Sequence, residues 1–341
     1  MDLDILQKLS LAYGPSGNEE EVRSLIRKKI SPYVDKVYTD KYGNLICYKK
    51  GKGPKILLVA HMDEIGLMIK GIDNEGNIFC SAIGGVEPEN MIGERVKIKT
   101  KKGFIHGVIT TSTVSNNDII TKVIDIKEMF VDTGLSKKEL IKLEVQPGEY
   151  LNLERYFMTL GSDNYVCGKA MDDRVGCYIL IELARKLRNV KQEIYYVFTV
   201  QEEVGLYGAK TSIYGLDPEY AVIVDVTSSD DKSAQPTKFL GRGPCLTIKD
   251  ADMLSNKCVD EWLKKAAKRK KIPLQLDISD EGTTDALTIS ISKGGIPTTV
   301  LGVAVRNLHT TIGIAHSKDI DNCVDVLAEA IKNPNLICKE H

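Results

Sequence analysis

Strand and helix patterns alternate along this chain, break off near residue 65 and resume near residue 164. The apolar runs KILLVAH (55–61), EIYYVFTV (193–200), YAVIVDV (220–226) and PTTVLGVAV (297–305) are typical of buried strands. Segments with helical spacing of apolar residues lie between them, which favours a largely parallel sheet with helices on both faces. We therefore predict an α/β, three-layer domain with a mostly parallel central sheet.

The interruption itself is rich in hairpin signals. Residues 66–163 contain alternating runs such as GLMIKGI and RVKIKTKKGFIHGVIT, separated by DNEGN, IGG and KKG. Neither flank alone has enough strands for a stable sheet, so an insertion explains the pattern better than two tandem domains. We predict one α/β domain formed by residues 1–65 and 164–341, with a small β-rich domain, barrel-like or PDZ-like, inserted at 66–163.

Local capping signals predict where two helices begin. In YGPSGNEEE, Ser16 or Asn18 can cap a helix whose first turn carries glutamates 19–21. Within the inserted segment, Ser136 and Glu139 have the spacing of a capping box, which predicts a short helix in LSKKELIKL.

Composition limits the partners of this chain. The 341 residues carry a formal net charge of -1, which provides no basic field for nucleic acid or an anionic membrane. No apolar run approaches the ~18 residues of a membrane span. The first ten residues, MDLDILQKLS, carry acids where a signal peptide needs bases. The eight cysteines form no C-x-x-C pair, and we expect most to be small core residues with free thiols in a cytoplasmic protein.

Side chains able to bind metals follow five apolar runs of the chain. They are His61 and Asp63 in HMDEIG, Asp172 and Asp173 in GKAMDDRVG, Glu202 and Glu203 in QEEVG, Asp225 in VIVDVT, and His309 in RNLHT. Ligands of open α/β sheets bind in the crevice beyond the carboxyl ends of the strands, where all five groups could converge. Each residue alone has an ordinary explanation, as a helix cap, a surface charge or a satisfied histidine. Only the combination of these residues indicates a site.

The chemistry of this set indicates metal ions. Several carboxylates in one crevice repel one another and need counter-charge; Lys169 and Arg174 could supply some, and two divalent cations would supply four charges. Histidine and carboxylate ligands without cysteine suit zinc, cobalt or manganese, with zinc as the default.

Spacing within two motifs predicts individual roles. His61 and Asp63 point the same way on an extended chain, so His61 suits a ligand and Asp63 the acceptor that orients its ring. Of the two adjacent glutamates, Glu203 would bind a metal and Glu202 would stand beside the metal-bound hydroxide as the general base.

The order and spacing of several motifs resemble the di-metal aminopeptidases that assemble as tetrahedral dodecamers. These motifs are YGPSGNEEEVR, HMDEIG, GKAMDDRVGC, QEEVGLYGA, DVT, GTTDA and the histidine near the C-terminus. The family includes glutamyl and deblocking aminopeptidases, and some relatives have been labelled endoglucanases or cellulases. The resemblance implies a cis peptide bond between Asp172 and Asp173, and an inserted domain through which subunits pair. It implies His61, Asp172 and Asp225 as ligands of one metal, and Asp172, Glu203 and His309 as ligands of the other, with Asp172 bridging.

Two further histidines and one further segment also bear on the predicted site. His316 is a rival of His309, but we prefer His309 because it directly follows a strand and keeps the family's spacing to Asp319. The GTTDA segment around Asp285 resembles a loop near the site, with either a structural or a substrate-side role. His341 is expected to be an ordinary surface histidine.

The predicted function is a metal-dependent aminopeptidase that removes N-terminal residues from short peptides. Two metals would bind the free α-amino group and the scissile carbonyl oxygen, and a water bridging them would attack while Glu202 moves the proton to the leaving nitrogen. Another amidohydrolase with the same metal site, such as a deacylase or carboxypeptidase, is one alternative. A glycoside hydrolase, whose two carboxylates need no metal, and an inactive assembly protein are others. The resemblance alone implies a homo-oligomer, with dimers assembling to a dodecamer.

Overall fold

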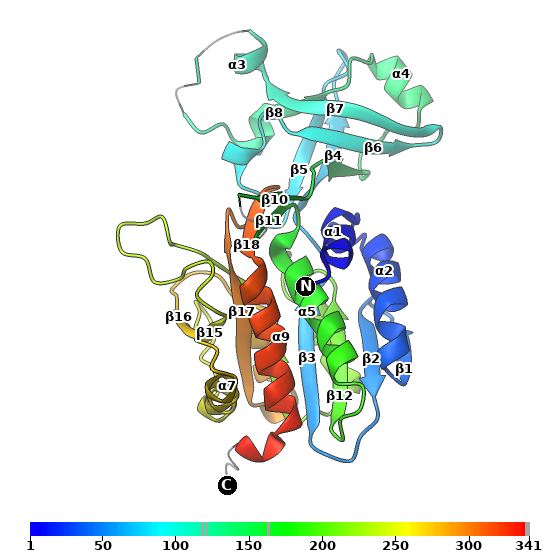
Figure 1. Cartoon of the computed structure of the whole chain (residues 1–341). Helices are drawn as coiled ribbons and strands as arrows, with labels where there is room; N and C mark the ends of the chain where they lie inside the picture. The colour runs from blue at the N-terminus through cyan, green and yellow to red at the C-terminus, as the bar shows by residue number, and fades with distance from the viewer. Residues whose placement is uncertain (117–118, 121, 162–163, 338–341) are drawn as a thin grey trace.

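The computed structural model describes residues 1–116, 119–120, 122–161 and 164–337, so His341 lies outside the described residues. The chain forms a large sheet covered by helices and a smaller barrel set on one end of it, at the top of Figure 1. No helix in the described part of the chain combines the length and apolarity needed to cross a membrane.

The centre of the large sheet is parallel and its flanks are antiparallel. The central strands, in spatial order, are β12 (Glu193–Thr199), β3 (Lys55–His61), β13 (Tyr220–Ile223) and β17 (Thr298–Arg306). The antiparallel flanks are β1 (Lys36–Thr39) and β2 (Leu45–Lys49) on one side, and β18 (Gly313–His316), β11 (Tyr165–Gly168) and β10 (Met158–Leu160) on the other. Three further strands lie off this path: β14 (Val226–Ser228), β15 (Cys245–Lys249) and β16 (Gln275–Ile278). The predicted parallel centre is confirmed, and the β18–β11–β10 flank was not anticipated.

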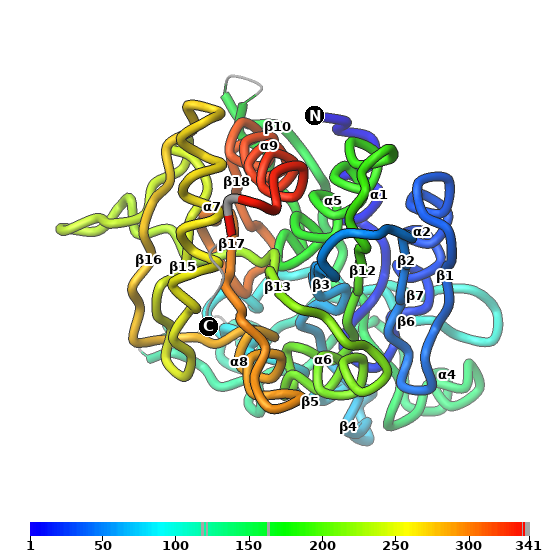
Figure 2. The backbone as a smooth tube through the Cα atoms, turned by 90° about the horizontal axis from the view of Figure 1, so that it is seen from below, coloured from blue at the N-terminus to red at the C-terminus, as the bar shows by residue number. Residues whose placement is uncertain are grey.

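Helices cover both faces of this sheet, which confirms the three layers. One face carries α1 (Leu3–Leu11), α2 (Glu20–Ile30), α5 (Met171–Lys186), α7 (Lys257–Lys270) and α9 (Ser317–Lys332), whose apolar residues form the main core with the strands. The other face carries the short helices α6 (Tyr207–Ser212) and α8 (Asp285–Ser290) over a second core. Figure 2, seen along the strands, shows the two helix layers on opposite sides of the sheet.

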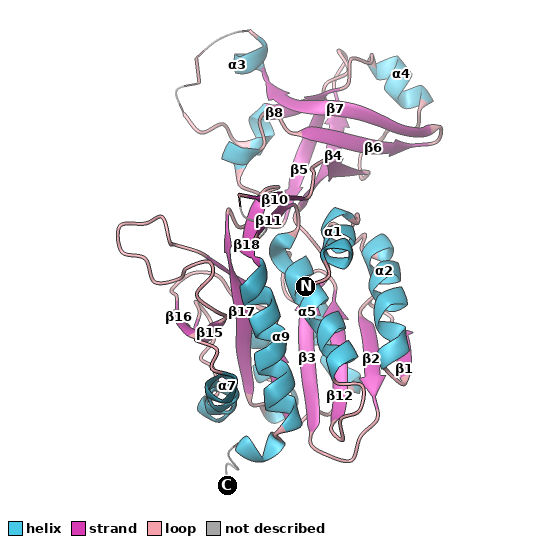
Figure 3. Cartoon of the chain, in the orientation of Figure 1, coloured by secondary structure: helices cyan, strands magenta, loops and turns pink. Residues whose placement is uncertain are grey.

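The segment between β3 and β10 builds the barrel. Its strands are β4 (Gly66–Ile72), β5 (Ile78–Ile83), β6 (Arg95–Thr100), β7 (Gly103–Thr111), β8 (Met129–Asp132) and β9 (Tyr150–Leu153), closed in the order β4-β5-β8-β7-β6-β9. The barrel has its own apolar core and two short helices, α3 (Ser112–Ser115) and α4 (Lys137–Lys142). The predicted capping box of Ser136 and Glu139 opens α4 (Figure 3). A closed barrel leaves no unpaired strand edge, which suits a small inserted unit.

One expectation about a helix start was wrong, and one cysteine is an exception to an expectation that is otherwise confirmed. Helix α2 has Glu19 as its N-cap and no side-chain cap, because the Ser16 hydroxyl donates a hydrogen bond of 2.6 Å to Asp63 instead. Among the cysteines, Cys258 is disulfide-bonded rather than a free thiol. Six others are free and buried, as expected of small core residues: Cys47, Cys80, Cys167, Cys177, Cys245 and Cys323.

Candidate metal centre

The polar residues predicted from the strand ends meet at one edge of the large sheet. Because β3, β12, β13 and β17 run parallel, their carboxyl ends lie together. His61 is the last residue of β3, and the residues after the other three strands follow there: Glu202 and Glu203 after β12, Asp225 after β13, and His309 after β17. Asp172 joins them from the first turn of α5.

Asp172 lies between the two histidines. Its Oδ1 is 2.9 Å from His61 Nε2, and its Oδ2 is 3.5 Å from His309 Nε2. Asp225 Oδ1 is 3.8 Å from the same nitrogen of His61, and Glu203 Oε2 is 3.6 Å from that of His309. One carboxylate therefore faces two separate groups of ligand atoms, one around each histidine.

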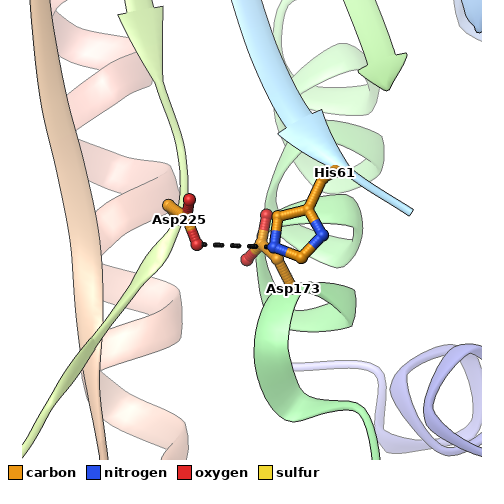
Figure 4. Close-up of side chains that lie close together, drawn as sticks. All are labelled: His61, Asp173 and Asp225. Carbon is orange, nitrogen blue, oxygen red and sulfur yellow. Dashed lines mark ion pairs between the residues drawn. The ribbon is translucent and has the colours of Figure 1, made fainter. Parts of the chain in front are cut away.

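Asp173 belongs to the cluster, although the sequence prediction counted it only among the candidates and gave it no role as a ligand. Ligand atoms of His61, Asp173 and Asp225 lie within 4.8 Å of one another, as do those of His61, Asp172 and Glu203. Figure 4 shows Asp173 beside His61 and facing Asp225. The doubled aspartate at the helix start was the available signal, but it is also the signature of a helix cap. The predicted cis peptide bond between Asp172 and Asp173 is present.

Asp173 is fully buried and only half satisfied. Its Oδ1 accepts a hydrogen bond of 2.9 Å from the backbone N–H of Gly176, while Oδ2 has no hydrogen-bond partner among the described residues. A buried carboxylate oxygen without a donor is costly unless something positive lies next to it.

Four carboxylates of the cluster have raised pKa values, because they are buried next to one another. Burial, together with repulsion from neighbouring carboxylates, raises the pKa of Asp173, Glu202 and Glu203 well above the ordinary values, despite the opposing effect of His61. For the same reasons the pKa of Asp225 rises to about 8. Several carboxylates in one buried pocket can all be ionised only beside cations that neutralise them. The donor set of carboxylates and imidazoles fits divalent zinc, cobalt or manganese.

The basic residues expected to balance this charge are paired elsewhere. Lys169 Nζ lies 2.7 Å from both oxygens of Glu64, and Arg174 Nη2 lies 3.3 Å from Glu64 Oε1. Arg174 also donates to the carbonyl oxygens of Leu9 and Ala12, which fastens the end of α1. The suggestion that these two cations pair with the carboxylates of the cluster is therefore wrong; among the described residues, the carboxylate that both contact is Glu64.

Asp63 lies beneath His61 and is completely buried. Its Oδ1 accepts from the backbone N–H of Glu202 at 3.0 Å and lies 3.5 Å from His61 Nδ1. Its Oδ2 accepts from the backbone N–H of Glu203 at 3.2 Å and from the Ser16 hydroxyl at 2.6 Å. Burial alone would raise the pKa of Asp63, but His61, Ser16 and the Glu202 N–H lower it below its usual value. One ionised carboxylate thus joins the end of β3, the segment before α2 and the glutamate pair.

His316 lies away from the cluster, whereas Asp285 lies beside the strand that leads to it. His316 is the N-cap of α9: its Nδ1 accepts from the backbone N–H of Lys318, and its ring meets Tyr165 edge-on. His309, and not His316, therefore faces Asp172. Asp285 begins α8 and accepts a hydrogen bond of 2.6 Å from Thr199 at the end of β12, and burial raises its pKa to about 6. The GTTDA segment thus packs beside the strand that leads to Glu202.

Comparison with known proteins identifies close relatives over nearly the whole length. The family model described as M42 glutamyl aminopeptidase matches residues 43–326. A protein of Acetivibrio thermocellus, classed provisionally as an aminopeptidase, is 39% identical over 331 residues, covering 96% of this chain and 98% of that protein. The lysyl aminopeptidase of Pyrococcus furiosus is 33% identical over 340 residues, covering 97% and 96%.

Solved structures also match this chain over nearly its whole length. An aminopeptidase from the archaeon Desulfurococcus kamchatkensis has a TM-score of 0.92 at 34% identity, over 98% of this chain and 95% of that one. The TET1 peptidase of Pyrococcus horikoshii, which can assemble into a tetrahedron or a large octahedral shell, has a TM-score of 0.84 at 30% identity, over 96% and 98%.

Proposed function

Because the chain belongs to the M42 glutamyl aminopeptidase family, we propose that the cluster around Asp172 is its active site and holds two divalent cations. Family membership supports metal-dependent aminopeptidase activity and does not favour a deacylase, a glycoside hydrolase or an inactive assembly protein. The number of metals, their identity and the role of each residue are our proposal, argued from the geometry.

The position of Asp172 carries the two-metal proposal. One of its oxygens faces His61 and the other faces His309, as a bridging carboxylate requires. We assign His61, Asp172 and Asp225 to the first metal, and Asp172, Glu203 and His309 to the second. Asp173 would add negative charge at the first position. Zinc is the proposed metal, and cobalt or manganese would suit the same nitrogen and oxygen donors.

The chain's own residues would orient the ligands and move the proton. Two bound cations would lower the pKa of a water molecule and polarise the substrate carbonyl. Asp63 faces the Nδ1 of His61 and thereby fixes which nitrogen points at the metal. The same carboxylate anchors the backbone of Glu202. Glu202, in a buried site with a raised pKa, would take the proton from water and deliver it to the leaving nitrogen.

The substrate class proposed is a short peptide with a free N-terminus. An unprotonated α-amino group is a metal ligand, and it would distinguish an exopeptidase substrate from an internal peptide bond. Water molecules and peptides would reach the cluster past His309, because its side chain is 36% exposed whereas that of His61 is 3% exposed.

The chain is proposed to assemble as a homo-oligomer through the inserted domain at 66–163. The barrel exposes large apolar side chains on β7 and the following segment, among them Phe104, Val108 and Val123. The relative from Pyrococcus horikoshii forms shells of many chains. Light scattering of the purified protein tests the finer proposal: a mass of twelve chains supports a dodecamer, and a monomer contradicts it. The cytoplasmic location expected from composition stays a prediction.

A substrate panel tests the proposed activity. Aminoacyl chromogenic amides and short peptides, each with a free or an acetylated N-terminus, would be incubated with untreated enzyme, chelated enzyme, and chelated enzyme with zinc, cobalt or manganese restored. We expect cleavage of the free-amine substrates alone, only with metal present. Equal cleavage of acetylated substrates would favour a deacylase or endopeptidase, and chelator-insensitive hydrolysis would contradict the metal-dependent mechanism.

A further inference from the structure

Two glycines of the barrel lie directly against the proposed second metal position. They follow β5, whose ladder with β4 pairs Ile83 with Gly66. That register places the Gly84–Gly85 turn beside Ile65, two residues after Asp63 in the chain. The turn therefore reaches from the inserted domain to the edge of the acidic cluster.

The approach is so close that a side chain on either glycine would displace a neighbouring side chain. A methyl group on Gly85 would lie 2.9 Å from Nδ1 and 3.2 Å from Cε1 of His309. A methyl group on Gly84 would lie 3.1 Å from Cβ and 3.3 Å from Oε2 of Glu203. Carbon atoms in contact are normally 3.5–4.0 Å apart, so a methyl group fits at either position only if the facing side chain moves. The two residues touched are those assigned to the second metal.

We propose that the Gly84–Gly85 turn is a positioning element of the metal centre. Its backbone packs against the ring of His309 and the carboxylate of Glu203 and holds both where the second metal needs them. This inference rests on the two-metal function proposed above. It gives the inserted domain a direct part in the site, in addition to any part in assembly.

His309 needs such support more than His61 does. A metal-binding histidine usually has its second ring nitrogen fixed by a nearby acceptor. His61 has Asp63 Oδ1 at 3.5 Å from Nδ1, an ion-pair contact, although among the described residues this nitrogen makes no hydrogen bond. In the described part of the chain no hydrogen bond holds Nδ1 of His309; that nitrogen faces Gly85. His309 also lies in the loop after β17, with a left-handed backbone (φ 55°) and a partly exposed side chain. Packing against the glycine turn takes the place of the missing hydrogen bond.

A second contact from the barrel side restrains the same loop. Arg155 follows β9, and its Nε donates a hydrogen bond of 2.9 Å to the hydroxyl of Thr311, two residues after His309. Arg155 also forms an ion pair with Glu94, a buried residue just before β6. The His309 loop is thus held between the glycine turn and an arginine that is itself anchored in the barrel.

The test compares two glycine-to-alanine variants of the full chain. Gly85→Ala adds a methyl group against the end of a side chain that can rotate away, so it displaces the His309 ring without requiring the backbone to move. Gly71→Ala, in β4 of the same barrel, adds the same methyl group where no non-neighbouring atom of the described part of the chain lies within 4 Å. Neither glycine has a left-handed backbone, so alanine is tolerated conformationally at both.

Zinc and cobalt binding to the metal-free proteins is measured by calorimetry, with the absorption of bound cobalt as a second readout. We expect two sites in the unmodified chain and in Gly71→Ala. In Gly85→Ala one site should be unchanged and the other about 10- to 100-fold weaker, the usual cost of losing support around a ligand. Thermal unfolding of the metal-free variants should match that of the unmodified chain.

A combined variant shows whether Gly85 acts through His309. Gly85→Ala added to His309→Ala should weaken binding no further than His309→Ala alone, because the residue it positions is gone. If the unmodified chain binds fewer than two metals, the two-metal function fails and this inference fails with it. If the unmodified chain binds two and Gly85→Ala binds both equally well, this inference alone is overturned. Equal weakening of both sites, or a lower melting temperature of metal-free Gly85→Ala, would also overturn it.

Discussion

Asp63 Oδ1 accepts a hydrogen bond of 3.0 Å from the backbone N–H of Glu202, so the carboxylate beneath His61 also holds the segment that carries the proposed base. The position of the base and the orientation of a metal ligand therefore depend on one buried side chain. Few substitutions in this chain should affect the site so strongly while touching no substrate.

Asp63→Asn tests that dependence. The amide offers one acceptor oxygen to three donors, from Glu202, Glu203 and Ser16, and its NH₂ group would face at least one of them. We expect the free energy of unfolding to fall by about 1–3 kcal/mol and kcat by roughly 10- to 100-fold. Urea denaturation and steady-state kinetics measure the two effects. The exposed Asp217→Asn serves as the control, and an unchanged kcat in Asp63→Asn would refute the role.

Glu202→Gln should separate metal binding from turnover. Glu202 is outside the proposed ligand set, so metal stoichiometry should stay that of the unmodified chain. Glutamine cannot take a proton, and kcat should fall by about 100- to 10,000-fold. Metal analysis of the purified variant and kinetics on the preferred amide give both values, with the exposed Glu281→Gln as the matched control. Turnover within threefold of normal would assign the proton transfer to another residue.

Alanine at the two rival histidines should give opposite results. His309→Ala removes a proposed ligand, so one metal should be lost or bound at least about 10-fold more weakly, with activity falling in parallel. His316→Ala removes the N-cap of α9 and should leave metal content and kcat unchanged while lowering stability by about 1 kcal/mol. Metal stoichiometry and thermal unfolding of both variants decide the matter; metal loss in His316→Ala alone would reverse the assignment.

Metal removal should change how stability depends on pH. In the metal-free chain the pKa of Asp225 is raised to about 8, and those of Asp173 and Glu203 are raised as well. Between about pH 4 and pH 8 the folded state therefore holds protons that the unfolded state has released, and the free energy of unfolding falls as pH rises. Bound cations replace these protons.

The stabilisation by zinc should accordingly be larger at about pH 8 than at about pH 5.5, by on the order of 2 °C or more in melting temperature. Thermal unfolding with and without chelator at both pH values measures it. An equal or smaller zinc effect at the higher pH would show that the acidic cluster is not where the metal binds.

Much of the architecture was predictable because it depends on local patterns. Apolar runs such as 55–61 and 297–305 are buried on both faces and read as central strands, and the helical spacing of residues 317–332 identifies α9. The flank formed by β18, β11 and β10 was missed, since strands of three or four residues carry too little periodicity to stand out. The barrel was anticipated from its hairpin signals, but its closure required the pairing of β4 with β9, which are separated by most of the domain.

The candidate site was predictable for a topological reason. Polar residues at the carboxyl ends of parallel strands are brought to one edge by the sheet, so His61, Glu203 and Asp225 could be grouped without knowing any distance. Asp173 was given no role at the site and Ser16 was not counted in it, because both have the appearance of helix caps in the sequence. Ser16 instead donates to Asp63, and Asp173 faces His61, contacts that no local pattern reports.

The sequence by itself determined the α/β class, the inserted β-rich segment, and the chemical nature of the site, because periodicity, turn residues and donor type are local properties. Only the tertiary structure decided which residues touch. It placed His309 and not His316 at Asp172, paired Lys169 and Arg174 with Glu64, and brought Gly85 of the barrel against His309, more than two hundred residues away. Such contacts depend on how separate elements pack, and packing is decided by the whole chain at once rather than by any segment of it.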